Sequence, residues 1–148
     1  MSEQSDRYFA RQGEAPPDGE GSFFQWDEQK PIEVVPGLTF KPVLGDQLMA
    51  NFVYFEPNTE APLHWHIEEQ ISLVLEGEFE FEVGSQKKIV KRGEAIIIPP
   101  NVPHAARTYD TTCLEMDIFN PPRQGLLELM GLISDKGKTT GPADRGLE

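Results

Sequence analysis

The chain has 148 residues, and its 25 Asp and Glu against 13 Lys and Arg give a net charge of -12 at neutral pH. This length suits one well-buried core and is short for two ordinary domains. The negative charge repels the phosphate backbone of nucleic acid and an anionic membrane surface, so neither is expected as a partner. An anionic substrate would have to be attracted locally, by a metal ion or by an arginine such as Arg92, Arg107 or Arg123.

The first 21 residues are polar and include the turn-forming run Pro16-Pro17-Asp18-Gly19. This composition predicts a flexible N-terminal arm over residues 1–21. The chain start lacks the basic residues and the apolar stretch of a signal peptide, and no segment is long enough to span a membrane. A single cysteine, Cys113, cannot form an internal disulfide and is expected to be a packed, inert thiol. We therefore expect a cytoplasmic protein.

Short apolar-rich or alternating segments follow the arm, and turn residues such as Pro36-Gly37 and Glu76-Gly77 separate them. This spacing is typical of an antiparallel sandwich or barrel. One helix is predicted over residues 125–133, and a disordered tail over residues 134–148. The predicted strands cover residues 32–35, 38–44, 48–55, 70–75, 78–83, 88–90, 95–98 and 113–119.

All three histidines of the chain fall within two short motifs, at residues 62–70 and 93–104. Side chains two apart on a strand point the same way, so His64, His66 and Gln70 are expected to share a face. His104 follows a glycine, an apolar run and a Pro-Pro-Asn turn. Three imidazoles and an amide oxygen suit a divalent transition metal with open coordination positions. Surface histidines on an edge strand, or histidines that fill a polar core, would also give the His-x-His pattern.

The two motifs resemble those of the cupin superfamily, whose members are small jelly-roll barrels with a central metal. Gly77, Gly93 and Pro99 match that pattern, whereas Asn58 and Asn101 stand where glycine is usual. Asparagine tolerates positive φ better than other non-glycine residues. The resemblance implies an all-β fold, a small antiparallel cupin barrel over residues 22–133 with one short C-terminal helix. It also implies one divalent ion (Ni, Fe, Mn, Zn or Cu) held by His64, His66, Gln70 and His104.

Within the cupins, the chain resembles the KdgF subgroup of pectin-degradation proteins over about residues 32–123. The resemblance rests on Gln70, which stands where most cupins have Glu, and on the run from Asp117 to Arg123. Members linearise 4,5-unsaturated monouronates to 5-keto-4-deoxyuronate, which implies a small anionic sugar acid as substrate. The resemblance implies an active site with Asp117, Phe119 and Arg123. If their strand face lines the barrel, Asp117 is placed to move a proton and Arg123 to bind the substrate carboxylate. Family habit further implies a homodimer formed through the terminal segments.

Three other functions remain open from the sequence. An oxygen-dependent cupin dioxygenase would commonly have Glu or a further His at the position of Gln70. A lyase of the dimethylsulfoniopropionate type would need a tyrosine where Ser72 stands, leaving Tyr54 or Tyr109 as substitutes. A non-catalytic cupin that binds metal or sugar is the third alternative.

Several candidate residues also have purely structural interpretations. Asp117 can be a solvated strand residue, and Arg123 can cap a loop. Phe119 can belong to the core, as strand aromatics usually do. Trp65 is expected to point away from the metal into packing, and the pair Glu68-Glu69 to form a charged loop edge.

Overall fold

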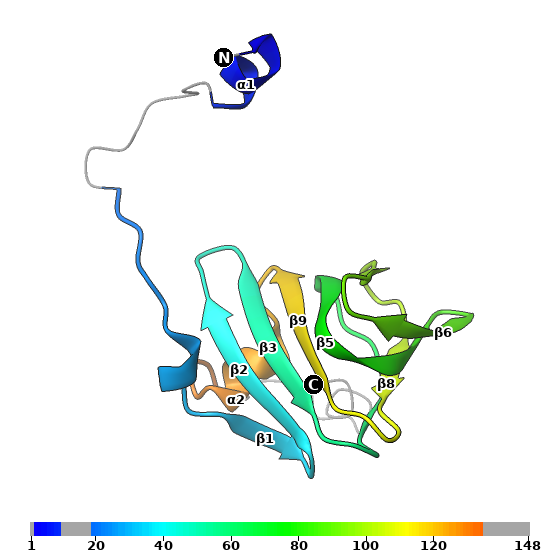
Figure 1. The fold of residues 1–148 in the computed structure, drawn as a ribbon. Helices are drawn as coiled ribbons and strands as arrows, with labels where there is room; N and C mark the ends of the chain where they lie inside the picture. Colours follow the sequence, from blue (N-terminus) through cyan, green and yellow to red (C-terminus); the bar gives the residue numbers. More distant parts are fainter. Residues whose placement is uncertain (1, 10–18, 135–148) are drawn as a thin grey trace.

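The computed structural model describes residues 2–9 and 19–134. Within these residues, nine strands form one curled antiparallel sheet with the order β1-β2-β3-β9-β5-β8-β4, and β6 and β7 also pair with β5 (Figure 1). The prediction of an all-β antiparallel barrel with a short C-terminal helix is confirmed. The elements are α1 (Glu3–Tyr8), a 3-10 turn (Trp26–Glu28), β1 (Ile32–Val35), β2 (Leu38–Leu44), β3 (Met49–Phe55), β4 (Glu60–His64), β5 (Glu69–Val83), β6 (Gln86–Lys91), β7 (Ala95–Ile98), β8 (His104–Arg107), β9 (Cys113–Asn120) and α2 (Gln124–Leu129).

Strand β5 is one long strand that belongs to both sides of the curled sheet. Its first part pairs with β7 and β9, and its second part pairs with β6 and β8. The sequence predicted two strands here with a turn at Glu76-Gly77, which is wrong. Gly77 instead bends the strand, with a φ of 76°, and a Cβ atom there would overlap the carbonyl oxygen of Thr112. Glycine therefore lets β5 change direction without ending.

Strands β4 and β8 were not among the predicted strands. They pair with each other, and their register places His64 opposite His104. Both strands are short, and the pairing between them is irregular after Ala61, so neither gives the clean alternation that identifies a strand in sequence. The other predicted strands agree with the observed ones to within two residues.

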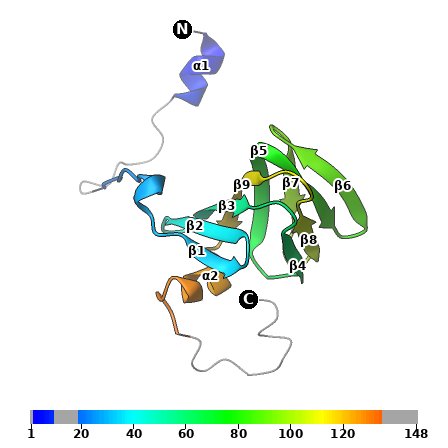
Figure 2. The ribbon, with the colours of Figure 1, turned by 60° about the horizontal axis from the view of Figure 1, so that its bottom comes forward.

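Helix α2 lies next to β1 in both views and packs on the sheet through Leu126 (Figures 1 and 2). It was predicted over residues 125–133 but has its last helical residue at Leu129. Gly131 has a φ of 75°, and its N–H donates to Glu128 while the N–H of Leu132 donates to Leu127. This pair of hydrogen bonds is a Schellman motif, which ends the helix earlier than its apolar pattern suggested.

The main core fills the curl of the sheet and includes Phe55, Phe79, Phe81, Ile98 and Cys113. The predicted arm over residues 1–21 contains the short helix α1, which has no buried residues. Part of this arm, residues 10–18, and the predicted tail after residue 134 lie outside the described residues, so both remain predictions. Among the described helices, none combines the length and apolar character required to cross a membrane.

Candidate metal centre and pocket

The three histidines meet at one place on the inner side of the sheet. His64 is the last residue of β4, His66 lies in the loop that follows, and His104 is the first residue of β8. One potential ligand atom from each histidine lies within 4.8 Å of those from the other two. The expectation that His64, His66 and Gln70 share one strand is wrong, because the chain leaves β4 after His64 and enters β5 at Glu69. The loop nevertheless returns His66 to the same site.

Each histidine is held by a backbone carbonyl two residues away. A carbonyl oxygen can only accept a hydrogen bond, so in His64 and His104 Nδ1 carries the hydrogen and Nε2 keeps its lone pair. The Nε2 atom of His104 is buried without a hydrogen-bond partner among the described residues. Such fixed rings, with free Nε2 lone pairs, are typical of metal-binding histidines. The Nδ1 to oxygen distances are 2.7 Å for His64 and Pro62, 3.1 Å for His66 and Glu68, and 2.9 Å for His104 and Val102.

The surroundings keep the three imidazoles neutral at physiological pH. Burial is the largest cause, and the positive charge of Arg123 adds to it. These effects lower the pKa of His64, lower the pKa of His66 to about 4 and lower the pKa of His104 to about 3. Neutral imidazole is the form that binds a metal ion. The donor set of this site therefore fits a divalent ion.

Gln70 lies beside the histidines, and a chain of hydrogen bonds fixes its orientation. Its Nε2 donates to Ser72 Oγ at 2.9 Å, and Ser72 Oγ donates to Asp117 Oδ1 at 2.7 Å. The Gln70 Oε1 atom therefore faces His66 Nε2, at 3.1 Å. Neutral His66 can donate its Nε2–H to this oxygen; with the hydrogen on Nδ1 instead, the two atoms present lone pairs that a cation can bind together. This arrangement makes Gln70 a candidate fourth ligand.

Strand β9 contributes Glu115, Asp117 and Phe119 to the same inner face. Asp117 is paired across the sheet with Ser72 on β5 and with Asn51 on β3. The Phe119 ring meets the His66 ring edge to face, with centroids 5.8 Å apart. The alternation of side chains along the strand thus places all three residues inside.

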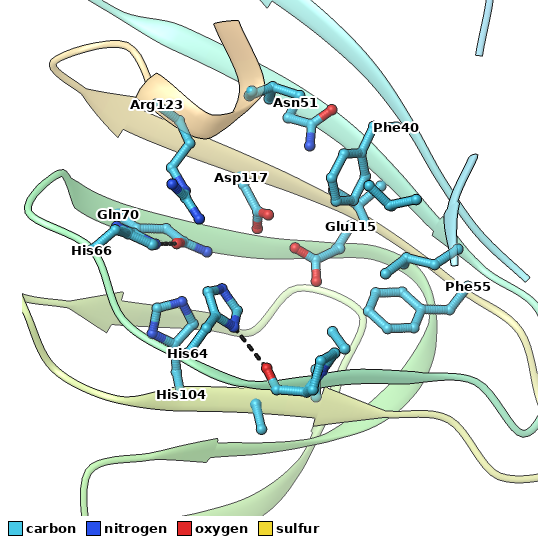
Figure 3. A pocket seen from close by; sticks show the side chains of 18 of the residues that line it. Phe40, Asn51, Phe55, His64, His66, Gln70, His104, Glu115, Asp117 and Arg123 are labelled. Carbon is cyan, nitrogen blue, oxygen red and sulfur yellow. Dashed lines mark hydrogen bonds between the residues drawn. The ribbon is translucent and has the colours of Figure 1, made fainter. Parts of the chain in front are cut away.

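A pocket of about 270 Å³ extends from the histidines into the curl of the sheet. Figure 3 shows Asp117 and Arg123 pointing toward the side chains of His64 and Gln70. The apolar lining includes Val34, Leu38, Phe40, Val53 and Phe55. The pocket therefore combines polar and apolar walls, and its polar lining residues are His64, His66, Gln70, His104, Asn51, Glu115, Asp117 and Arg123.

Glu68 is buried, at 5% exposure, which corrects the expectation of a charged loop edge for this residue, whereas Glu69 is exposed. The Oε2 atom of Glu68 accepts a hydrogen bond from the backbone N–H of Gln124 at 2.8 Å, and the Oε1 atom of Glu68 lies 3.5 Å from His66 Nδ1. Glu68 therefore connects the histidine loop to the start of α2, where Arg123 is the N-cap residue. No periodicity in the sequence indicates this long-range contact.

Other residues considered from the sequence lie outside the pocket. Arg107 pairs with Glu60 and Glu80, and Arg92 is exposed. Tyr54 and Tyr109 are both more than a third exposed, and no tyrosine lines the pocket within the described residues. Trp65 is 41% exposed, so it points away from the histidines as expected but is not packed in the core.

Cys113 is fully buried, as expected, at the far end of β9 from Phe119. Burial is the main reason that the pKa of its thiol is raised to about 12. The thiol therefore stays protonated at neutral pH, which suits a packed and unreactive side chain.

Comparison with known proteins gives a consistent picture. The cupin domain family model matches residues 51–118. The pectin degradation protein KdgF of Dickeya dadantii is 30% identical over 107 residues, which cover 71% of this chain and 97% of that protein. The solved structure of KdgF from Halomonas sp. has a TM-score of 0.68 and 33% identity, covering 73% of this chain and 100% of that one.

A further relative, the H2HPP isomerase of Bacillus subtilis, is 42% identical over 67 residues. That match covers 44% of this chain but 28% of the isomerase, so the likeness is confined to a single segment of the larger protein. The matched residues 51–118 of the family model include all three histidines and Gln70. Fold, motifs and full-length KdgF matches together show that this chain belongs to the cupin family.

Proposed function

We propose that this protein is a metal-dependent enzyme that opens the ring of 4,5-unsaturated uronates and yields 5-keto-4-deoxyuronate. One observation carries the proposal: Asp117 lines the same pocket as the three histidines and is linked to Gln70 through Ser72. The likeness to two KdgF proteins over nearly their whole length supports the same class of reaction. The isomerase name of the Bacillus subtilis relative is compatible with an enzyme of this type.

The proposed metal ligands are His64, His66, Gln70 and His104. A bound divalent ion would supply Lewis acidity toward a substrate oxygen. All four ligands are neutral, so they leave the charge of the ion uncompensated and favour an anionic, oxygen-rich substrate. Arg123 adds a second positive charge in the pocket and can bind the substrate carboxylate with two parallel hydrogen bonds.

Asp117 is the proposed proton carrier. Its carboxylate takes the proton of the anomeric hydroxyl, the bond between the anomeric carbon and the ring oxygen breaks, and the ring oxygen leaves as an enolate oxygen on C5. Asp117 then returns this proton to C4, which converts the enolate into the ketone and restores the carboxylate, so the overall reaction is an isomerisation without a co-reactant. Ser72 keeps Asp117 oriented through the 2.7 Å hydrogen bond. Phe119 provides an apolar surface next to the histidines.

The proposal is tested by following the ultraviolet absorbance of the conjugated carboxylate, with protein of known metal content. Spontaneous opening is subtracted with a sample that contains no enzyme. Asp117→Asn is expected to reduce the enzymatic rate by about 100-fold or more, because general acid–base groups contribute at least this factor. The exposed Asp110→Asn change is the matched control and should leave the rate unaltered.

Native protein with a full metal site that does not accelerate the reaction would refute the assignment. The oxygen-dependent cupin would then be the leading alternative, and consumption of O₂ in an electrode cell would test it. Equal rates for the native protein and Asp117→Asn would instead retain the reaction but remove Asp117 from it.

We also infer that the protein is a homodimer. Ile71 on β5 and Ile97 on β7 form a cross-strand pair on the outer face of the sheet, and they are 39% and 68% exposed. Exposed isoleucines side by side are costly in water and are covered when two sheets associate. Light scattering that gives a monomer mass at all concentrations would contradict this inference. The cytoplasmic location remains a prediction from the sequence.

A further inference from the structure

Two buried polar side chains of the pocket have no part in the proposed metal site. Glu115 on β9 and Asn51 on β3 are 3% and 1% exposed, and both line the pocket. Glu115 Oε1 and Asn51 Oδ1 have no hydrogen-bond partner within the described part of the chain. Figure 3 shows the Glu115 carboxyl pointing into the pocket beside Asp117. The cross-strand neighbours of Glu115 are Val53 and Val74, so its immediate sheet environment is apolar.

Such oxygens are unfavourable in a closed core. A buried acceptor without a partner costs about 1–3 kcal/mol, and the great majority of buried polar groups in proteins are therefore paired. The neighbouring positions on the same inner face are Val53, Val74 and Phe55, and side chains of this kind would fill the space without that cost. Two unpartnered acceptors in one pocket therefore indicate a partner that comes with a ligand.

The ionisation of Glu115 indicates which chemical group this partner carries. Burial is the main cause, and the adjacent Asp117 the second, of a pKa for Glu115 well above its usual value. This shift favours the neutral acid form of Glu115, in which the acid hydrogen has an acceptor in the hydrogen-bonded Asp117. Oε1 remains as an acceptor, so it needs a donor from the ligand. A ligand carboxylate would be repelled by Asp117, whereas a hydroxyl group can donate at no electrostatic cost.

We propose that Glu115 Oε1 and Asn51 Oδ1 form a hydroxyl-binding subsite that recognises the hydroxyl groups of a hydroxylated carboxylic acid. The carboxylate of the same ligand lies on the histidine side of the pocket, where Arg123 supplies a positive charge. The subsite rests on the proposed function for its ligand class, a uronate, and it adds the orientation of the sugar. The ring spans the pocket, with its acid group at the histidine side and its hydroxyls at β3 and β9.

The subsite is tested by binding rather than by turnover. Calorimetry measures the dissociation constants of two acids for the metal-loaded protein. D-galacturonate carries ring hydroxyls and lacks the 4,5 double bond, so it is not consumed, and tetrahydropyran-2-carboxylate has the same ring and acid group without hydroxyls. The native protein is expected to bind galacturonate more tightly.

Glu115→Leu is expected to weaken galacturonate binding by about 3- to 10-fold, the value of one or two neutral hydrogen bonds. It should leave binding of tetrahydropyran-2-carboxylate within about 2-fold, since that acid makes no contact with the subsite. Glu115→Gln keeps a carbonyl oxygen and a donor toward Asp117, so galacturonate binding should stay within about 3-fold of native. Asn51→Ala provides a second variant with the same selective loss. Metal content and melting temperature are measured for every variant.

Three outcomes would overturn the subsite. Native protein could bind both acids equally or bind neither at millimolar concentration. Glu115→Leu could weaken both acids to the same extent, which would make Glu115 a structural residue. It could also leave galacturonate binding unchanged. If the protein bound galacturonate more tightly but did not open the ring of unsaturated uronates, the proposed reaction would be wrong and the subsite would stand. If it opened the ring but bound both acids equally, the subsite would be wrong and the reaction would stand.

Discussion

Removal of the Glu68 carboxylate tests whether the metal site and the start of α2 are mechanically linked. Glu68 Oε2 accepts the backbone N–H of Gln124 at 2.8 Å, and Oε1 lies 3.5 Å from His66 Nδ1. The His66 Nδ1 atom is also held by the Glu68 carbonyl oxygen, which any substitution retains. Glu68→Ala should therefore preserve the tautomer of His66 but release the N-terminus of α2 and, with it, Arg123.

The size of the effect follows from these contacts. A buried hydrogen bond to a charged acceptor contributes about 1.5–3 kcal/mol, so Glu68→Ala should lower the free energy of unfolding by about 2 kcal/mol. Loss of an outer partner of a metal ligand weakens binding by about 10- to 100-fold. Because the carbonyl contact to His66 remains, we expect a value near 10-fold. Glu68→Gln keeps an oxygen for the N–H of Gln124 and should show less than half of each effect.

Urea unfolding with a chelator present measures the stability term, because bound metal would otherwise add its own binding free energy. Competition with a chromophoric chelator measures the metal affinity. Glu69→Ala is the matched control, since its side chain is exposed and neighbours the same loop. If Glu68→Ala and Glu69→Ala give the same stability and the same affinity, the proposed link between His66 and α2 is wrong.

Two further predictions concern the bend in β5 and the histidine cluster. Gly77→Ala should destabilise the protein by about 3 kcal/mol or more, because the added Cβ overlaps the Thr112 carbonyl oxygen. Gly93 has a similar φ of 85° but open space around it, so Gly93→Ala should destabilise the protein by about 1 kcal/mol. If urea unfolding gave the same loss of stability for both variants, the proposed overlap at Gly77 would be wrong. In metal-free protein, His66 and His104 have folded pKa values of about 4 and about 3, below the unfolded value of 6.5. The unfolded chain therefore binds more protons below pH 6.5, so stability should fall by roughly 2 kcal/mol per unit between pH 6 and 5. Glu115 contributes to the pH dependence of stability with the opposite sign, because its folded pKa is raised. The slope is therefore measured in the Glu115→Gln variant. A free energy of unfolding that does not change between pH 6 and 5 would refute the histidine pKa values.

The barrel class could be predicted because its signals are local. Alternating apolar residues and frequent Gly and Pro turns identify most strands to within two residues. Gly77 shows where local reasoning fails, because a glycine at positive φ can end a strand or bend it. The deciding contact is the Thr112 carbonyl, which approaches from a loop far along the chain.

In the candidate site, too, local features could be predicted and long-range contacts could not. His64, His66 and His104 were identified from their spacing, although the assumed continuous strand through His66 does not exist. The burial of Glu68 could not be predicted, since it depends on the N–H of Gln124, which is 56 residues away. The apolar surroundings of Glu115 also arise from neighbours on β3 and β5, which only the strand order brings together.

On the inner face of β9, an apolar residue at position 115 would favour stability, whereas the polar Glu115 favours ligand binding. Glu115 lies between Val53 and Val74 on a buried face, and a leucine of similar volume would pack there without an unpartnered oxygen. Replacement of buried ionisable groups by apolar ones is often neutral or stabilising by about 1–4 kcal/mol. Glu115→Leu is therefore expected to raise the free energy of unfolding by about 1 kcal/mol in urea, while it weakens galacturonate binding. A variant that loses stability would show that the carboxyl supports the fold through Asp117. A variant that gains stability and loses the ligand would show that this polar group is kept in the barrel for binding.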